Sequence, residues 1–262
     1  NDDILKKIAA IAADNGLDAL VAASPENFAY LAGFVVPSHH ILRWRHSMLV
    51  VKPDASAAAF TVDMEESTVA GRLPGIPLTS WGEFTDNSME VFAGLLRDLS
   101  LTQGRIGIET DYLPARDLDI LKRALPKVEF VASQDLFNRA RMIKTERELD
   151  LLKRLSRISD QGIADALAGA SVGSSEMKMA ADLTGGIYSR GAEDFKLMII
   201  ATGERSQLPN VGPSERLLAS GDICRVEIFS IIGGYHAGVC RTAYVDKPPD
   251  HAERIWAILS DA

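Results

Sequence analysis

The stretch around Gly233-Gly234 constrains the fold most strongly, because apolar runs flank the two glycines on both sides. Adjacent glycines are a turn signal for a two-residue β-hairpin, since both central positions need backbone conformations that glycine adopts easily. The flanking segments 222–232 and 238–246 are therefore predicted to be antiparallel strands. The apolar segment 196–202 predicts a further strand before them.

Two helices are predicted upstream of these strands. Thr145 and Glu148 form a capping-box pattern, and the leucines and isoleucines that follow recur on one helical face. A second helix is predicted from Glu176 to the glycines at 185–186, which we interpret as its stop signal. Two helices followed by strands indicate an α+β domain.

The first part of the chain follows a different order, in which strand and helix patterns alternate. Apolar strand patterns lie at 17–22, 47–51, 57–62, 105–109 and 128–131, and helical patterns lie at 4–15, 86–99 and 114–125. Strands separated by helices indicate an α/β domain, a mixed sheet with flanking helices. A length of 262 residues accommodates two domains, and we predict them at residues 1–140 and 141–262.

Charge and cysteine content narrow the classes of protein. A net charge of −8, from 28 basic and 36 acidic residues, argues against a nucleic-acid or membrane-surface partner, since both need clustered Lys and Arg. No apolar run approaches the roughly 20 residues that span a bilayer. Cys224 and Cys240 show no metal-site spacing, so we expect buried free thiols in a cytoplasmic protein.

Several short motifs occur in a defined order along the second segment. They are IKTERE at 143–148, GSSE at 173–176, the Gly-Asp pair before the first hairpin strand, and the hairpin from Glu227 to Thr242. Together they resemble the creatinase/aminopeptidase P/prolidase family of pita-bread hydrolases (peptidase family M24), closer to its metal-free creatinase-like members. The first segment resembles the N-terminal domain of that family. The resemblance implies that 141–262 is only the first half of a pita-bread domain.

The hairpin departs from the pattern of the metallopeptidases in this family. In those members, two aspartates eleven residues apart hold a pair of divalent metal ions, and Glu227 and Gly238 stand at the matching positions. Glycine has no side chain, so one of the bridging carboxylates is lost. The resemblance implies that the other ligands, a histidine and two glutamates, belong to the second half of the domain. We expect neither a bound metal nor another cofactor.

The creatinase-like members use a histidine as general base and acid, and Asn210 stands at the position that matches it. Asparagine cannot exchange a proton near neutral pH, but its amide can hold a substrate carbonyl or carboxylate. We therefore expect Glu227 and His236, facing each other across the hairpin, to form the catalytic acid–base pair. The alternative is that His236 is a surface residue and that Glu227 pairs with Arg225 or Arg241.

A substrate pocket is expected beside the hairpin, lined by Phe195, Asn210, Tyr235 and Arg241. The Arg241 guanidinium suits a carboxylate, and its alternative role is a salt bridge to Glu227.

A second group of basic residues lies in the first domain. In dimers of the family, the N-terminal domain of one subunit closes over the active site of the other. The resemblance therefore implies that Arg43, Arg45 and His46 bind an anionic part of the substrate. The alternative is that residues 38–46 form an exposed loop.

These features lead to three hypotheses about function. The first is a homodimeric, metal-independent C–N bond hydrolase that acts on a small carboxylate-bearing amide, amidine or amino-acid derivative. The second is an Xaa-Pro aminopeptidase or dipeptidase with an altered metal site, which would be activated by Mn²⁺ or Co²⁺. The third is a non-catalytic member of the family that binds a ligand without turning it over.

Overall fold

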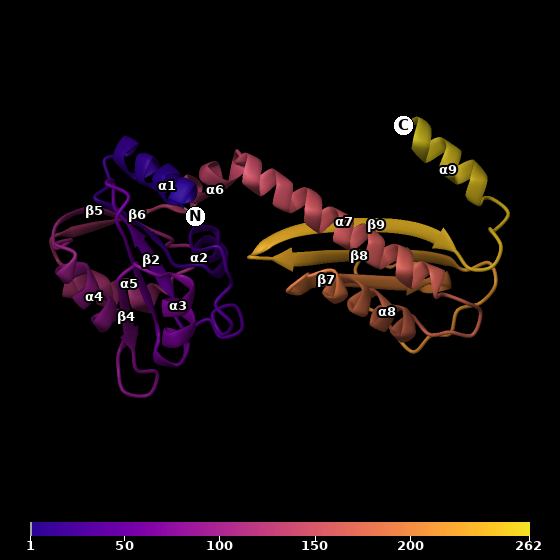
Figure 1. Ribbon diagram of the computed structural model, residues 1–262, viewed down its shortest axis with the longest axis horizontal. Helices are drawn as coiled ribbons and strands as arrows, with labels where there is room; N and C mark the ends of the chain where they lie inside the picture. The colour runs from indigo at the N-terminus through magenta and orange to yellow at the C-terminus, as the bar shows by residue number, and fades with distance from the viewer. Residues whose placement is uncertain (1) are drawn as a thin grey trace. The chain divides into compact units, whose positions relative to one another are not determined.

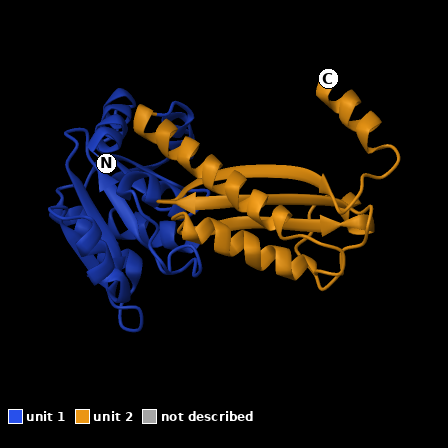
Figure 2. Cartoon of the chain, turned by 45° about the vertical axis from the view of Figure 1, so that its right-hand side comes forward, with its two compact units in different colours: residues 1–144 blue, residues 145–262 orange. Residues whose placement is uncertain are grey.

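The structure is a computed structural model that describes residues 2–262. It consists of two compact units, Asn1–Lys144 and Thr145–Ala262 (Figure 2). Sequence patterns placed the boundary at residue 140, four residues before the division between the units. The difference arises because an additional helix, α6 (Gln134–Met142), completes the first unit and because Thr145 caps the first helix of the second.

Unit 1 is built on a six-stranded mixed sheet in the order β4-β3-β2-β1-β5-β6 (Figure 1). Its strands are β1 (Ala19–Ala22), β2 (Met48–Val51), β3 (Ala57–Val62), β4 (Leu78–Trp81), β5 (Gly104–Ile108) and β6 (Val128–Ala132). β2 runs antiparallel to both β1 and β3, and the other neighbours are parallel. The predicted α/β class of this domain agrees with the structure.

Helices cover both faces of this sheet. They are α1 (Asp2–Asp14), α2 (Pro25–Ala32), α3 (Glu66–Arg72), α4 (Ser88–Asp98), α5 (Ala115–Ala124) and α6, with a short 3₁₀ turn at Asp63–Glu65. α4 and α5 contribute Phe92 and Leu121 to a core that also holds Val21 of β1. All four residues of β1 are fully buried, which is the reason for its continuous apolar run.

The sequence patterns missed three elements of unit 1. β4 has four residues at the sheet edge and is mostly half-buried, so its apolar signal is weak. α3 has seven residues, of which Val69 is buried. α6 is polar on average, and it buries Phe137 and two smaller side chains. Short elements that bury one or two large side chains give little periodicity to detect.

Unit 2 has two long helices on one face of a three-stranded antiparallel sheet in the order β7-β8-β9 (Figure 1). Its elements are α7 (Glu146–Ala168), α8 (Glu176–Ser189), β7 (Asp194–Thr202), the 3₁₀ helix η2 (Gly203–Gln207), β8 (Ile223–Ile232), β9 (Tyr235–Tyr244) and α9 (Ala252–Asp261). The Thr145–Glu148 capping box is formed. Gly233 and Gly234 have φ values of 56° and 81°, which confirms the predicted hairpin turn.

Two predicted boundaries in unit 2 are wrong. α8 does not end at Gly185-Gly186 but continues to Ser189. Gly186 lies where α8 crosses α7, and a Cβ there would be 3.2 Å from the Cα of Gly162. The glycine therefore serves close helix packing rather than helix termination. β9 begins at Tyr235, directly after the turn, and not at residue 238.

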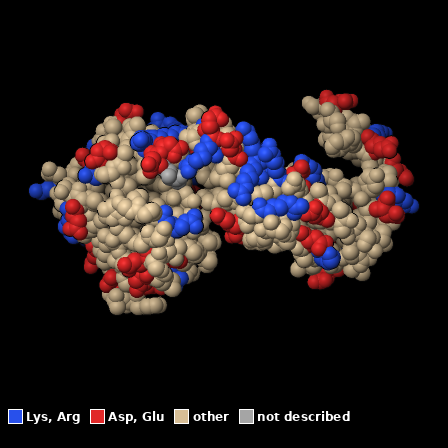
Figure 3. All heavy atoms as spheres, in the orientation of Figure 1, with Lys and Arg blue, Asp and Glu red and all other residues tan. Residues whose placement is uncertain are grey.

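The outer surface of the protein carries mixed charge. Figure 3 shows Lys and Arg gathered along part of the visible face, with Asp and Glu among them. α9 has no buried residue and exposes its apolar side chains, Ile255, Trp256, Ile258 and Leu259. Within residues 2–262, none of the helices combines the length and apolar character needed to cross a bilayer.

Candidate functional site

The two faces of the unit 2 sheet differ because side chains alternate along β8. Val226 and Ile228 are fully buried against α7 and α8. The intervening residues point to the opposite face and are half-buried. Residues directly opposite each other in an antiparallel ladder share a face, and the ladder pairs Glu227 with Cys240, Phe229 with Gly238 and Ile231 with His236. We call the surface formed by Arg225, Glu227, Phe229, Ile231, His236, Gly238 and Cys240 the open face.

Phe229 and Gly238 are matched in shape at the centre of the open face. A Cβ on Gly238 would lie 2.4 Å from Cε1 and 2.6 Å from Cζ of the Phe229 ring. The ring therefore occupies the space that any side chain at position 238 would need. Sequence reasoning recognised that position 238 lacks a carboxylate, but it missed that an aromatic ring fills the place.

We expect the Gly238→Ala substitution to lower the free energy of unfolding by about 1–3 kcal/mol, because the new methyl group overpacks against Phe229. In a Phe229→Ala background the same substitution should cost close to nothing, since the ring is gone. Urea denaturation of the four proteins of this double-mutant cycle measures the coupling. Gly185→Ala is a matched control, because a Cβ there meets no heavy atom within 4 Å. Equal costs in both backgrounds would contradict the packing argument.

The expected direct contact between Glu227 and His236 is not formed by the hairpin. Cys240 lies opposite Glu227, and His236 lies opposite Ile231, four residues further along β8. At about 3.4 Å per residue, the two candidate residues are about 14 Å apart along the sheet. They share the open face but do not pair across it. Cys240, which was expected to be buried, is an exposed free thiol, whereas Cys224 is free and buried.

Three other candidate residues belong to the opposite face of the sheet. Phe195 pairs with Ser230 and packs against the core below α7 and α8. Tyr235 donates a hydrogen bond of 2.8 Å from its hydroxyl to Oε1 of Glu148 on α7. Arg241 lies next to Cys240 in sequence, so strand alternation places it on the helix side.

The predicted pocket roles of these three residues are therefore corrected. Arg241 forms an ion pair of 2.6 Å with Asp160 of α7 rather than the alternative salt bridge to Glu227. A one-residue step along a strand moves a side chain to the other face, and the sequence reasoning did not apply this rule to residues near the hairpin.

Asn210 is linked to the open face through the loop that carries it. Arg225, two residues before Glu227 on the same face, donates from Nη2 to the carbonyl oxygens of Leu208 and Pro209, the latter at 3.1 Å. The two residues before Asn210 are therefore held at the Glu227 end of the open face. The His236 end lies at the turn.

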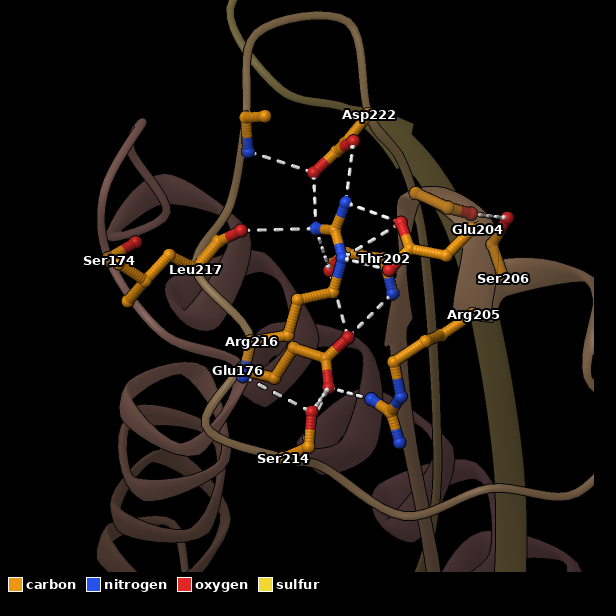
Figure 4. A network of polar contacts seen from close by, with 12 residues as sticks. Ser174, Glu176, Thr202, Glu204, Arg205, Ser206, Ser214, Arg216, Leu217 and Asp222 are labelled. Atoms are coloured by element: carbon orange, nitrogen blue, oxygen red, sulfur yellow. Dashed lines mark hydrogen bonds and ion pairs between the residues drawn. The ribbon is translucent and has the colours of Figure 1, made fainter.

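A second arginine organises the base of this loop (Figure 4). Arg216 donates to Asp222 at 2.5 Å and to Glu204 at 2.8 Å. Burial opposes the charged form of Asp222, but the hydrogen bonds from Arg216, the hydrogen bond from the Ala219 N–H and the positive charge of Arg216 together hold the pKa of this carboxyl below its usual value. Gly203 has a φ of 53°, a backbone conformation that favours glycine, and a Cβ there would lie 2.2 Å from Nη2 of Arg216. The contacts of Arg216 with Asp222 therefore fix the point at which β8 begins.

In unit 1, the three basic residues expected to bind an anion have partners within the unit. Arg45 forms two hydrogen bonds to Glu83, at 2.7 and 2.9 Å. His46 is 2% exposed and bonds Asp117 at 2.9 Å, and Arg43 donates to the carbonyl oxygen of Tyr112. The anion-binding prediction for Arg45 and His46 is therefore corrected, because nearby carboxylates already engage both side chains. Arg43 also lies over the Tyr112 ring, at 5.5 Å from its centroid.

The residues of the open face do not fit the pair of metal ions that the resemblance associates with this hairpin. Gly238 supplies no side-chain ligand, and the Phe229 ring lies over it. Across residues 2–262, no group of three or more His, Cys, Asp and Glu side chains is arranged to hold a metal ion. A dinuclear site needs several oxygen ligands that converge on both ions. Of the two hairpin positions that match the metal-binding aspartates, Glu227 alone offers a carboxylate.

Comparison with known proteins covers both units. Residues 4–143 match the creatinase/prolidase N-terminal domain, and residues 150–262 match metallopeptidase family M24. The chain is 25% identical to the Xaa-Pro dipeptidase of Pyrococcus horikoshii, in an alignment that covers 98% of this chain and 68% of the dipeptidase. It is also 25% identical to the creatinase of a Bacillus species, over 93% of this chain and 60% of the creatinase.

Solved structures show the same fold. The Xaa-Pro dipeptidase from Bacillus anthracis superposes with a TM-score of 0.81 at 22% identity, and the match covers 100% of this chain and 70% of the dipeptidase. Unit 1 corresponds to the N-terminal domain of these proteins, and unit 2 belongs to their pita-bread fold. The chain is therefore a member of the creatinase/prolidase family of M24 hydrolases.

Proposed function

We propose that this protein is a metal-independent hydrolase of C–N bonds, and that its substrate is a small carboxylate-bearing amide, amidine or amino-acid derivative. The observation that carries the proposal is the Phe229 ring over Gly238. The ring replaces an anionic ligand with an apolar surface at the point where a cation would need an anchor. In the proposed mechanism, the rest of the site works without the charge that a metal would supply.

Glu227 is the group we assign to activate water. As a carboxylate it accepts a proton from a water molecule, whose oxygen then forms a bond to the substrate carbon. The C–N bond breaks, and the proton passes to the leaving nitrogen, which departs as an amine. Asn210, on the loop held by Arg225, binds the substrate carbonyl or carboxylate through its amide. His236 lies too far along the sheet to act on Glu227 directly, so we assign it to the distal end of the substrate.

Two further parts of the proposal concern the whole protein. The relatives named Xaa-Pro dipeptidase and creatinase support a small-molecule substrate for this chain as well. We propose a homodimer, which sedimentation velocity would test. The two free cysteines support a reducing, cytoplasmic location.

Metal dependence is the decisive test. The natural protein, purified without added metal, should contain substoichiometric transition metal by mass spectrometry. It should turn over at least one member of a panel of creatine, Gly-Pro and N-acyl amino acids, at a rate that EDTA does not change. Activity that is lost with the chelator and restored by Mn²⁺ or Co²⁺ would instead support the Xaa-Pro peptidase alternative. Binding of a panel compound without turnover would support a non-catalytic protein.

A further inference from the structure

Glu176 is an unusually buried acidic residue close to the candidate site. Its side chain is 0% exposed, in the first turn of α8. A buried carboxylate is costly unless hydrogen bonds and a cation compensate for its lost hydration. Capping of α8 does not explain the burial of Glu176. The side chain of Ser175 already caps this helix by accepting a hydrogen bond from the Lys178 N–H. The partners of Glu176 therefore indicate its role.

The Glu176 carboxylate joins three separate segments (Figure 4). Its Oε1 accepts hydrogen bonds of 2.8 Å from both the backbone N–H and the hydroxyl of Thr202, at the end of β7. Its Oε2 accepts from the N–H of Ser214 at 3.0 Å and from the Ser214 hydroxyl at 2.7 Å. The guanidinium of Arg205, in η2, is its ion-pair partner. One carboxylate thus fixes both ends of the loop that contains Asn210.

Two arginines extend this support toward Asn210 from both sides. Arg205 donates from its second terminal nitrogen to the carbonyl oxygen of Gly212 at 2.9 Å. On the other side, Arg225 binds the carbonyl oxygens of Leu208 and Pro209. The backbone is therefore held two residues after Asn210 and at the two residues before it.

We propose that Glu176 is a positioning residue for catalysis, which holds residues 208–214 so that the Asn210 amide is fixed beside Glu227. The inference rests on the proposed function in one respect, the role of Asn210 in substrate binding. Glu176 itself touches no substrate, and it acts through Arg205 and Ser214. Preorganisation of this kind matters because an amide on a mobile loop would lose conformational freedom each time substrate binds.

The first test is hydrogen exchange of the natural protein with the Glu176→Gln substitution. Exchange in peptides covering 207–214 should accelerate by about tenfold or more, while the β8–β9 hairpin stays protected. Glu253→Gln is the control, because it removes an equal charge from an exposed side chain on α9, outside the loop. If Glu176→Gln does not fold, Arg205→Gln breaks the same link at a more exposed residue. Unchanged exchange in residues 207–214 overturns the proposal.

The second test separates positioning from general stability. With the panel substrate that the protein turns over, Glu176→Gln should lower kcat/KM by about tenfold, equivalent to about 1.4 kcal/mol. In an Asn210→Ala background the same substitution should have little further effect, because a residue that acts through Asn210 has nothing left to position. Independent, multiplicative losses would overturn this role. A protein that proves to need metal would refute the proposed function, yet the exchange result would still decide the role of Glu176.

Discussion

Replacement of Glu227 by glutamine should lower kcat by roughly 10²–10⁴-fold, the usual contribution of a general base. Glutamine keeps the size of the side chain and its half-buried place opposite Cys240, but it cannot accept a proton from water. The fold should be unaffected, because the substitution leaves the ladder between β8 and β9 intact.

Steady-state kinetics on the panel substrate, together with near-UV circular dichroism, measures this effect. Asp160→Asn is the control, because Asp160 pairs with Arg241 on the helix side of the same sheet. Its kcat should stay at the value of the unmodified protein. His236→Ala should raise KM more than it lowers kcat, in keeping with a distal contact. If Glu227→Gln retains full activity and His236→Ala abolishes it, His236 rather than Glu227 is the base.

The hairpin shows how much of the site could have been predicted from the sequence. The two-residue turn at Gly233-Gly234 fixes the register, and counting outward from it gives every cross-strand pair. That count places Cys240 opposite Glu227 and Phe229 opposite Gly238. The expectation of a Glu227–His236 contact ignored this register, although the information was present in the sequence.

Other parts of the site could not be obtained by counting. The loop between η2 and β8 has no periodic pattern, and its position depends on Arg205, Arg225 and Glu176, which reach it from three different elements. A glutamate at the start of a helix is ordinarily explained by the helix dipole. Its burial and its bonds to Ser214 depend on tertiary packing, so neither was predictable. The partners of Arg45 and His46, Glu83 and Asp117, are equally remote in sequence.

The fold class was easier to predict from the sequence than the site, because long helices and strands have strong apolar patterns. α7 combines a capping box with seven buried residues, and β1 is a continuous apolar run. Glycine pairs were ambiguous, because Gly233-Gly234 forms a turn whereas Gly185-Gly186 lies inside α8 at a close helix crossing. In the turn, glycine is needed for its backbone conformation, and in α8 Gly186 is needed because there is little room for a side chain. Sequence alone does not distinguish these two cases.

The Glu109→Ala substitution should destabilise unit 1 by about 3 kcal/mol or more. Glu109 follows β5 and is 3% exposed. Its carboxylate accepts hydrogen bonds from the N–H groups of Ala23 and Ser24, at 2.6 and 2.9 Å, and from the Asn27 amide at 2.6 Å. Alanine would leave all three donors buried without this acceptor, and each unsatisfied group costs about 1–3 kcal/mol.

The carboxylate joins the end of β5 to the segment between β1 and α2, so its loss should release the start of α2 first. Urea denaturation gives the change in unfolding free energy, and hydrogen exchange of residues 23–28 localises it. Glu129→Ala is the control, since Glu129 is 66% exposed in its ion pair with Arg105 and should change stability by no more than about 0.5 kcal/mol. Equal unfolding midpoints for the two variants would show that water replaces the lost acceptor, and the three hydrogen bonds would then not hold this end of the sheet together.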